Sequence, residues 1–310
     1  MDPDDAPPGD PFVHPALFYR GEEEYLAGTV PFLRDGLDAG EPVAVAVPGP
    51  RLGVLRAALG AADGVQWLDM TEAGRNPGRI IPGVLRAFAD RHPAGRVRII
   101  GEPIWPGRTD TEYPACAQHE ALINLAFAGR EVSILCPYDV AGLDDAVISD
   151  ARATHPVVID RDGARASEDY APGRVIESYN LPLPEPSDAA RMSFDLDALP
   201  RVREFTCHWA RHLGLAPDPA GDLEVAVHEL AANSCLHGGG KGTARIWFED
   251  GQVVCEVSDA GTIDDPLAGR RPAAMSPFGG RGILLVNHLA DLVRVYTGPE
   301  GTAIRVYMRV

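Results

Sequence analysis

Residues 227–238 read Val-His-Glu-Leu-Ala-Ala-Asn-Ser-Cys-Leu-His-Gly, and they decide the fold of the C-terminal half. The segment ends a predicted helix, so Glu229 and Asn233, four residues apart, lie on one face, and His237 continues that line. A carboxylate beside a carboxamide oxygen suits Mg²⁺, and the carboxylate can also take a proton from an attacking hydroxyl. Taken alone, the segment is equally consistent with a solvated polar face that ends at Gly238.

Three more segments follow this helix along the chain. Residues 257–263 read Val-Ser-Asp-Ala-Gly-Thr-Ile, which places Asp259 at a strand end before a tight glycine turn. Residues 278–283 read Phe-Gly-Gly-Arg-Gly-Ile and are predicted to open a helix over about 280–289. The unpaired N–H groups at such a helix start favour a phosphate. Residues 301–303, Gly-Thr-Ala, begin the last predicted strand.

In this order, the four segments resemble the GHKL ATPase superfamily of histidine kinases, Hsp90, gyrase B and MutL, and most closely its anti-sigma-factor serine kinases. The resemblance covers about residues 194–310 and implies a two-layer α+β sandwich, the Bergerat fold, that binds ATP and Mg²⁺. In that family the helix glutamate is the general base and the asparagine holds magnesium. These roles fall on Glu229 and Asn233.

The resemblance also implies where the nucleotide lies. Asp259 would accept a hydrogen bond from the adenine amino group, and Gly261 would let the adenine approach. The predicted nucleotide-binding set is Asn233, His237, Asp259, Gly261, Gly280, Arg281, Gly282 and Thr302. Ile263 departs from the family pattern, which usually has a second glycine there, so we expect a stiffer or smaller adenine side of the site.

The N-terminal half alternates short apolar runs with amphipathic stretches from His14 to about residue 159. Such a pattern predicts a buried parallel sheet with helices on both faces, an α/β fold. The segments His-Pro-Ala-Leu-Phe-Tyr at 14–19, Gly-Glu-Pro-Val-Ala-Val at 40–45 and Leu-Cys-Pro-Tyr-Asp at 135–139 resemble the MEDS sensory domain, which is similar to a RecA-like core.

No Walker A motif follows any predicted strand of this half, so we do not expect phosphate-loop ATP binding there. The resemblance to the MEDS domain implies a sensory role with an unknown small-molecule signal. Cys116 and His119 could hold a metal ion together with Cys136, and His14 is another candidate ligand. Ordinary packing is the favoured interpretation of all four residues.

The predicted organisation has four parts: a disordered tail over 1–11, the sensory domain over 12–160, a proline-rich linker over 161–188 and the ATPase domain over 189–310. The acidic, proline-rich start is unlike a signal peptide. No apolar run approaches the length of a membrane span. These features, with five widely spaced cysteines and no CxxC pair, predict a cytoplasmic protein with reduced thiols.

The net charge of −17 argues against direct binding to nucleic acid, since an acidic surface repels phosphates. Lys241, the only lysine, follows three glycines at 238–240. It precedes a predicted strand and not a helix, so the segment is predicted to be a connector and not a P-loop.

Two functions are compatible with these residues. The first is a serine/threonine protein kinase that phosphorylates an anti-anti-sigma partner of the STAS type and sequesters a sigma factor, under control of the sensory half. The second is a sigma-factor-binding module with little or no catalysis. A sensor histidine kinase using His208 or His212 is a weaker alternative, because their helix is short and no long dimerisation hairpin precedes it. The sequence is also compatible with a homodimer.

Overall fold

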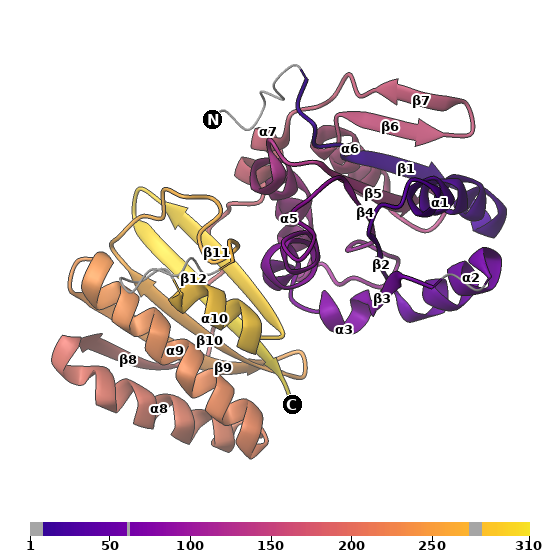
Figure 1. Cartoon of the computed structure of the whole chain (residues 1–310). Coiled ribbons are helices and arrows are strands. Elements are labelled where there is room, and N and C mark those ends of the chain that lie inside the picture. Colours follow the sequence, from indigo (N-terminus) through magenta and orange to yellow (C-terminus); the bar gives the residue numbers. More distant parts are fainter. Residues whose placement is uncertain (1–8, 61–62, 273–280) are drawn as a thin grey trace. The chain divides into compact units, whose positions relative to one another are not determined.

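The structure is a computed structural model that describes residues 9–60, 63–272 and 281–310 (Figure 1). The chain forms two compact units, residues 1–179 and 180–310, which are described separately below. No helix in the described ranges is long and apolar enough to cross a membrane.

The N-terminal unit is built on a seven-stranded sheet with the strand order β3-β2-β4-β5-β1-β6-β7. The first six strands of that order run parallel, and β7 pairs antiparallel with β6 at one edge. The strands are β1 (Pro15–Tyr19), β2 (Val43–Val47), β3 (Val65–Asp69), β4 (Val97–Gly101), β5 (Val132–Asp139), β6 (Val157–Asp160) and β7 (Gly163–Ala166).

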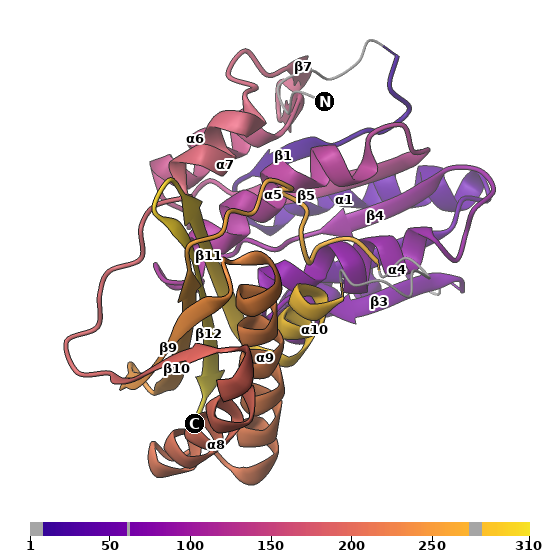
Figure 2. The ribbon, with the colours of Figure 1, turned by 90° about the vertical axis from the view of Figure 1, so that its left-hand side faces the viewer.

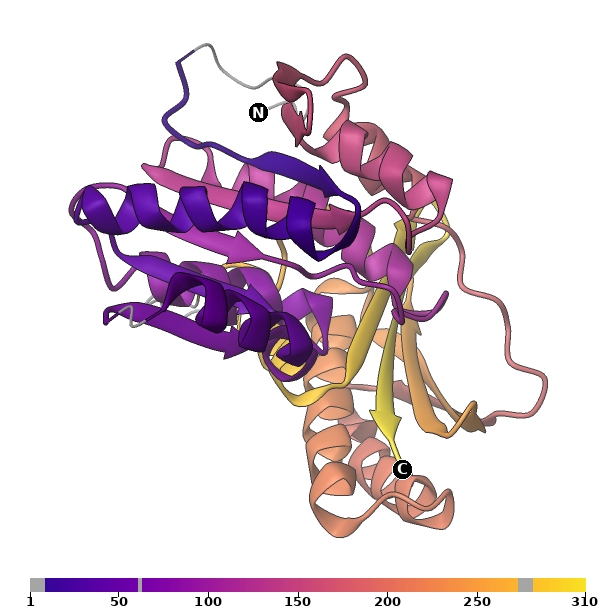
Figure 3. The same cartoon turned by 90° about the vertical axis from the view of Figure 1, so that its right-hand side faces the viewer.

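Helices cover both faces of this sheet, as the alternating sequence pattern predicts. Helices α5, α6 and α7 lie over one face (Figure 2), and α1 and α2 lie over the other (Figure 3). The helices are α1 (Gly21–Asp38), α2 (Gly49–Leu59), α3 (Met70–Ala73), η1 (Pro77–Arg79), η2 (Ile81–Leu85), α4 (Arg86–Ala89), α5 (Tyr113–Phe127), α6 (Asp145–Thr154) and α7 (Pro172–Ser178).

The predicted linker over 161–188 is wrong in its first part, which forms β7 and α7. Val175 of α7 is 3% exposed and packs with Ala117 and Ala121 of α5. The proline at position 172 misled the prediction, because a proline in the first helical turn begins a helix as readily as it breaks one. The N-terminal unit therefore continues to residue 179.

The predicted tail also needs a correction. Residues 1–8 lie outside the described part of the chain. The side chain of Asp10, however, accepts hydrogen bonds from the backbone N–H groups of Phe12 (2.9 Å) and Gly129 (3.0 Å). These bonds fasten the end of the predicted tail to the loop before β5.

The C-terminal unit is an antiparallel five-stranded sheet in the order β11-β12-β10-β9-β8, with its helices packed on one face (Figure 1). This is the α+β sandwich that the sequence predicts. The strands are β8 (Ala190–Asp195), β9 (Lys241–Glu249), β10 (Gln252–Asp259), β11 (Leu292–Gly298) and β12 (Gly301–Arg309). The helices are η3 (Leu196–Ala198), α8 (Leu199–His212), α9 (Pro217–His237) and α10 (Gly282–Leu289).

The core of this unit is made of every second residue of the strands, together with apolar residues of α9 that recur every three or four positions. Val253 and Val257 of β10 point toward the helices, where Leu223, Val227 and Leu230 of α9 are almost fully buried. Glu229 and Asn233 lie beside the buried stripe, on the flank of α9 that the start of α10 approaches, and each is half-buried. Packing of α9 thus determines where its polar residues point.

Candidate functional site

A cavity of about 520 Å³ lies in the C-terminal unit between α9, the segment that follows β10, the start of α10 and β12. Its volume is in the range of small-molecule sites. Most of the predicted site residues line it, namely Asn233, His237, Asp259, Gly261, Arg281, Gly282 and Thr302. Gly280 lies outside the described residues. The four sequence segments therefore meet around one space.

Asp259, the last residue of β10, is held by two hydrogen bonds. The Oγ hydroxyl of Ser234 donates to its Oδ2 atom at 2.6 Å, and the backbone N–H of Gly261 donates to Oδ1 at 2.8 Å. Each carboxylate oxygen keeps a further lone pair for a ligand. The sequence analysis does not include Ser234 among the site residues. A polar residue on an apolar stripe was the available signal.

Close backbone packing around Asp259 explains the glycines at 238 and 261. A Cβ atom added at Gly238 would lie 2.3 Å from Cγ of Asp259. One added at Gly261 would lie 2.8 Å from Cα of Gly238. Only glycine fits at these positions, so the chain after β10 can pass against the end of α9.

Thr302 fixes the same segment from the other side. Its hydroxyl donates to the carbonyl oxygen of Gly261 at 2.9 Å and contacts the hydroxyl of Thr297 at 3.0 Å. The Thr297 hydroxyl in turn accepts from the backbone N–H of Ile263 at 3.0 Å. Ile263 packs against the apolar core and lines the cavity. The departure from the family pattern therefore makes one wall apolar.

The start of α10 meets the polar face of α9. A Cβ atom added at Gly282 would lie 3.1 Å from Oε2 of Glu229 and 3.0 Å from Nδ2 of Asn233. Helix α10 begins at Gly282, two residues later than predicted, and its first N–H groups lack helical partners. A carboxamide and a helix N-terminus thus line one end of the cavity, and the Glu229 carboxylate lies behind Gly282 without lining the cavity itself.

The two remaining candidates, His237 and Arg281, are more exposed. His237 is the last residue of α9, and Arg281 is the N-cap of α10. Both line the cavity from its rim. Cys235, one turn from the site, has a thiol pKa raised by burial and by the nearby carboxylates of Asp195 and Asp259. It therefore stays protonated near neutral pH and is a poor nucleophile.

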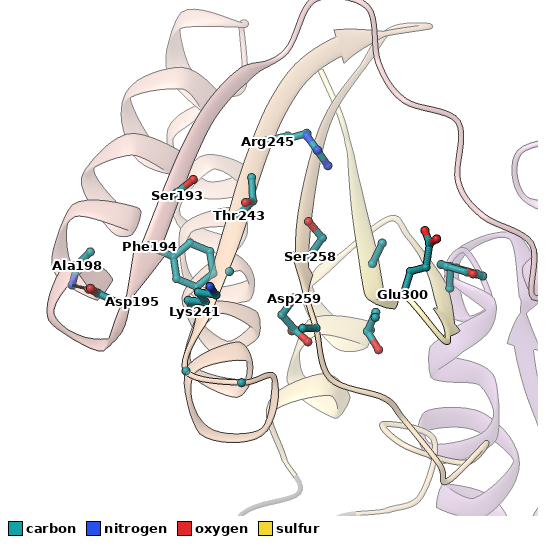
Figure 4. A pocket seen from close by; sticks show the side chains of 18 of the residues that line it. Ser193, Phe194, Asp195, Ala198, Lys241, Thr243, Arg245, Ser258, Asp259 and Glu300 are labelled. Atoms are coloured by element: carbon teal, nitrogen blue, oxygen red, sulfur yellow. Dashed lines mark hydrogen bonds between the residues drawn. The ribbon is translucent and has the colours of Figure 1, made fainter.

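A second, more open hollow of about 1020 Å³ shares Asp259 and Thr302 with the first (Figure 4). It is lined mainly by β8, β9 and β10, and Lys241 lies in it. Lys241 begins β9, after a connector in which Gly239 and Gly240 adopt positive φ angles of 88° and 85°. Lys241 lines this hollow, and the residues that line the first cavity do not include it.

Comparison with protein families agrees with this geometry. Residues 13–156 match the family described as MEDS, the methanogen/methylotroph, DcmR sensory domain, and residues 192–308 match the histidine kinase-like ATPase domain. The chain carries a MEDS domain and a histidine kinase-like ATPase domain. The ATPase match spans α9, β10, α10 and β12, which supply the cavity.

One solved structure that resembles part of the chain is that of the RsbU and RsbW domains of Rv1364c from Mycobacterium tuberculosis. The match has 20% sequence identity and a TM-score of 0.31, and it covers 40% of this chain and 33% of that one. The chain thus spans about a third of the solved relative. No curated protein matches the chain.

Proposed function

We propose that the ATPase domain binds Mg-ATP and transfers its γ-phosphate to a serine hydroxyl of a partner protein. The observation that supports this most is the contact of Gly282 with Glu229 and Asn233. It sets the start of α10 against a carboxylate and a carboxamide, at a cavity whose wall also contains the oriented carboxylate of Asp259.

On this proposal Asp259 recognises the base. Its carboxylate accepts a hydrogen bond from the exocyclic amino group of adenine, in the direction set by Ser234 and Gly261. Guanine has a carbonyl oxygen at that place and would meet the carboxylate lone pair to lone pair. Ile263 and Ile283 offer an apolar wall to a purine ring. The site then selects ATP over GTP.

The polar face of α9 serves the phosphate end. The Asn233 side-chain oxygen is a hard ligand suited to Mg²⁺, and the start of α10 with Arg281 complements the phosphate charge. Glu229 accepts the proton of the attacking serine hydroxyl. Bound Mg-ATP supplies the phosphoryl group, and the residues of the chain position it and remove the proton.

The pairing of a MEDS domain with this ATPase domain supports a regulatory role. We propose an anti-sigma-factor kinase of the cytoplasm that sequesters a sigma factor and phosphorylates an anti-anti-sigma protein of the STAS type. A small molecule at the MEDS domain would set its activity, and a homodimer is compatible with the proposal. The motifs quoted above support this assignment, because they resemble the serine kinase branch of the superfamily most closely.

The test uses the full chain with γ-labelled ATP, Mg²⁺ and the STAS-type proteins encoded beside its gene. We expect calorimetric binding of ATP but not GTP, and label on a serine of one partner. Glu229→Gln should abolish the label, whereas Asp222→Ala, which changes an exposed carboxylate on the same helix, should not. ATP binding without transfer to any partner would favour the binding module. Label on His208 or His212 would favour a histidine kinase.

A further inference from the structure

Four buried side chains with metal-binding atoms meet inside the N-terminal unit. His14 directly precedes β1, Glu120 lies on α5, Cys136 lies on β5, and His155 directly follows α6. One ligand atom from each lies within 4.8 Å of all the others. Each of the four residues is at most 1% exposed. The group joins four segments that are distant in sequence.

This cluster corrects the sequence expectation for a metal site. Of the predicted ligands, Cys136 and His14 do belong to the cluster, but Cys116 and His119 do not. Glu120 and His155 take their place. Glu120 follows the predicted His119 by one residue, and that step moves the ligand to another side of helix α5.

The distances between the ligand atoms fit a single tetrahedral ion. Oε2 of Glu120 lies 3.3 Å from Nε2 of His14 and 3.2 Å from Nε2 of His155. Sγ of Cys136 lies 3.4 Å from Nε2 of His14. Zinc bonds of about 2.0–2.3 Å at tetrahedral angles put neighbouring ligand atoms about 3.3–3.6 Å apart. These three spacings match edges of such a tetrahedron, and all four ligand atoms lie within 4.8 Å of one another.

The hydrogen bonds behind the two histidines turn their lone pairs toward this point. Nδ1 of His14 lies 3.1 Å from Oδ1 of Asn124, whose amide nitrogen donates to Thr154 at 2.8 Å, so Oδ1 is the acceptor. Nδ1 of His155 lies 2.8 Å from the carbonyl oxygen of Ala151. With the proton on Nδ1, Nε2 of each neutral ring is a bare acceptor. Metal-binding histidines are held in this way.

Without a cation, the Cys136 thiol can donate to Nε2 of His14, but the Glu120 carboxylate and Nε2 of a neutral His155 present acceptors to each other. In the described part of the chain, neither oxygen of Glu120 has a hydrogen-bond partner, and Nε2 of His155 has none either. The Glu120 carboxylate has an ionic partner only if His14 or His155 is protonated, and a buried carboxylate without one is costly. Protonating both histidines would place two buried cations side by side, with ring centroids 4.1 Å apart. A single divalent ion satisfies all of these atoms at once.

We propose that the N-terminal unit binds one Zn²⁺ through Nε2 of His14, Oε2 of Glu120, Sγ of Cys136 and Nε2 of His155. Nitrogen, sulfur and one carboxylate oxygen in a tetrahedron suit zinc, whereas Mg²⁺ and Ca²⁺ take oxygen ligands alone. The Cys136 thiol releases its proton to solvent as the zinc–sulfur bond forms. Four protein ligands leave no open position, so the ion has a structural role.

Zinc would tie together the segments around β1. This strand lies between β5 and β6 in the sheet, and the ligands come from its own entry, from β5, from the segment before β6 and from α5. Because the site forms only when these segments are in place, binding free energy adds to the folding free energy of the unit. Removal of the metal should therefore destabilise the N-terminal unit first.

The test measures metal content and stability of the full chain, purified under reducing conditions and reconstituted with Zn²⁺. We expect about one zinc per chain by elemental analysis, and a melting transition that falls by roughly 5–10 °C after chelation and returns with zinc. Cys136→Ser should lose most of the zinc. Cys116→Ser, the same change at a buried cysteine outside the cluster, should keep it.

Two results would overturn the proposal. One is a folded wild-type chain that takes up no stoichiometric zinc, and the other is a Cys136→Ser variant that holds zinc as tightly as the wild type. If Cys136→Ser does not fold, cobalt replaces zinc in the wild-type chain. Tetrahedral Co²⁺ with one thiolate ligand then gives intense visible bands and a sulfur-to-metal charge-transfer band, and their absence counts against the site.

Discussion

Ser234 donates a hydrogen bond of 2.6 Å to Asp259, and this bond links helix α9 to the end of strand β10. The serine is 1% exposed, so water cannot replace it. The direction in which Asp259 presents its free lone pairs therefore depends on a residue that lies on the buried stripe of α9.

Ser234→Ala should weaken ATP binding without unfolding the ATPase domain. A hydrogen bond to a charged group contributes about 1.5–3 kcal/mol, and part of that is kept because Gly261 still holds the other oxygen. We expect a loss of affinity of roughly threefold to thirtyfold by calorimetry. Ser258→Ala is the control, since Ser258 lines the second hollow next to Asp259. Equal affinity of the two variants would contradict the role of Ser234.

Asp259→Asn should weaken ATP binding and relax the preference over GTP. The amide can donate to the guanine carbonyl, which the carboxylate repels, and it loses the charged hydrogen bond to adenine, worth about 1.5–3 kcal/mol. Competition binding of ATP and GTP to the wild type and to the variant measures the ratio of the two nucleotide affinities for each protein. An unchanged ratio would show that Asp259 does not read the base.

Glu229→Ala and Asn233→Ala should separate catalysis from binding. A general base acts on the attacking hydroxyl, so Glu229→Ala should slow transfer by about 10²–10⁴-fold while ATP affinity largely survives. A magnesium ligand acts in the bound state too, so Asn233→Ala should damage both. Nucleotide affinity and single-turnover transfer are measured for each variant, with circular dichroism as the folding control. Wild-type transfer by Glu229→Ala would exclude this glutamate as the base.

Gly282→Ala tests whether the start of α10 must touch α9. The added methyl group would lie 3.0–3.1 Å from Asn233 and Glu229, so one of the elements has to move. We expect at least a tenfold loss of phosphoryl transfer. Gly221→Ala is the matched control on α9, because its methyl group would have nothing within 4 Å. That change should leave transfer intact and stabilise the domain by about 0.5–1 kcal/mol.

Glu102, which follows β4, gives the N-terminal unit a pH-dependent stability. Burial raises the pKa of its carboxyl to about 8 from 4.5, opposed by the charge of Arg51 and assisted by that of Asp139. Between these two values the folded chain holds a proton that the unfolded chain has released. Stability contributed by this group is therefore complete below pH 4.5, falls as pH rises to about 8, and is flat above.

Glu102→Gln should remove this dependence. Thermal unfolding of the N-terminal unit from pH 5 to 8.5 is compared between wild type and variant, and the slope should shrink by up to about 1.4 kcal/mol per pH unit. Glu72→Gln, at an exposed carboxylate of the same unit, should keep the wild-type slope. Identical slopes for wild type and Glu102→Gln would contradict the assignment.

Local patterns predicted the two fold classes, because apolar runs and helical stripes are set by neighbouring residues. The positions of Asn233 and His237 on α9 and of Asp259 at the end of β10 could be predicted for the same reason, while their roles stay predictions. The proposed zinc site could not be predicted from the sequence, because Glu120 and His155 become neighbours only when α5 and the end of α6 pack beside β1. The partnership of Ser234 with Asp259 likewise requires the closed sandwich.

The boundary between the units is also misplaced by prediction from local sequence patterns. Proline and polar residues suggested that the second unit starts near 189, whereas Asn180 already belongs to it. The side chain of Asn180 bonds both the N–H (3.0 Å) and the C=O (2.7 Å) of Thr297 on β11. A side chain that pairs with a distant strand in this way leaves no pattern in the local sequence.

This pairing holds the first residue of the C-terminal unit against strand β11. Tyr179 directly follows helix α7. The next residue, Asn180, makes two hydrogen bonds with the backbone of Thr297. The hydroxyl of Thr297 is in turn joined to Ile263 and Thr302 at the wall of the cavity. Within the C-terminal unit, a shift of the chain at Asn180 would therefore reach the wall of the cavity through one residue, Thr297.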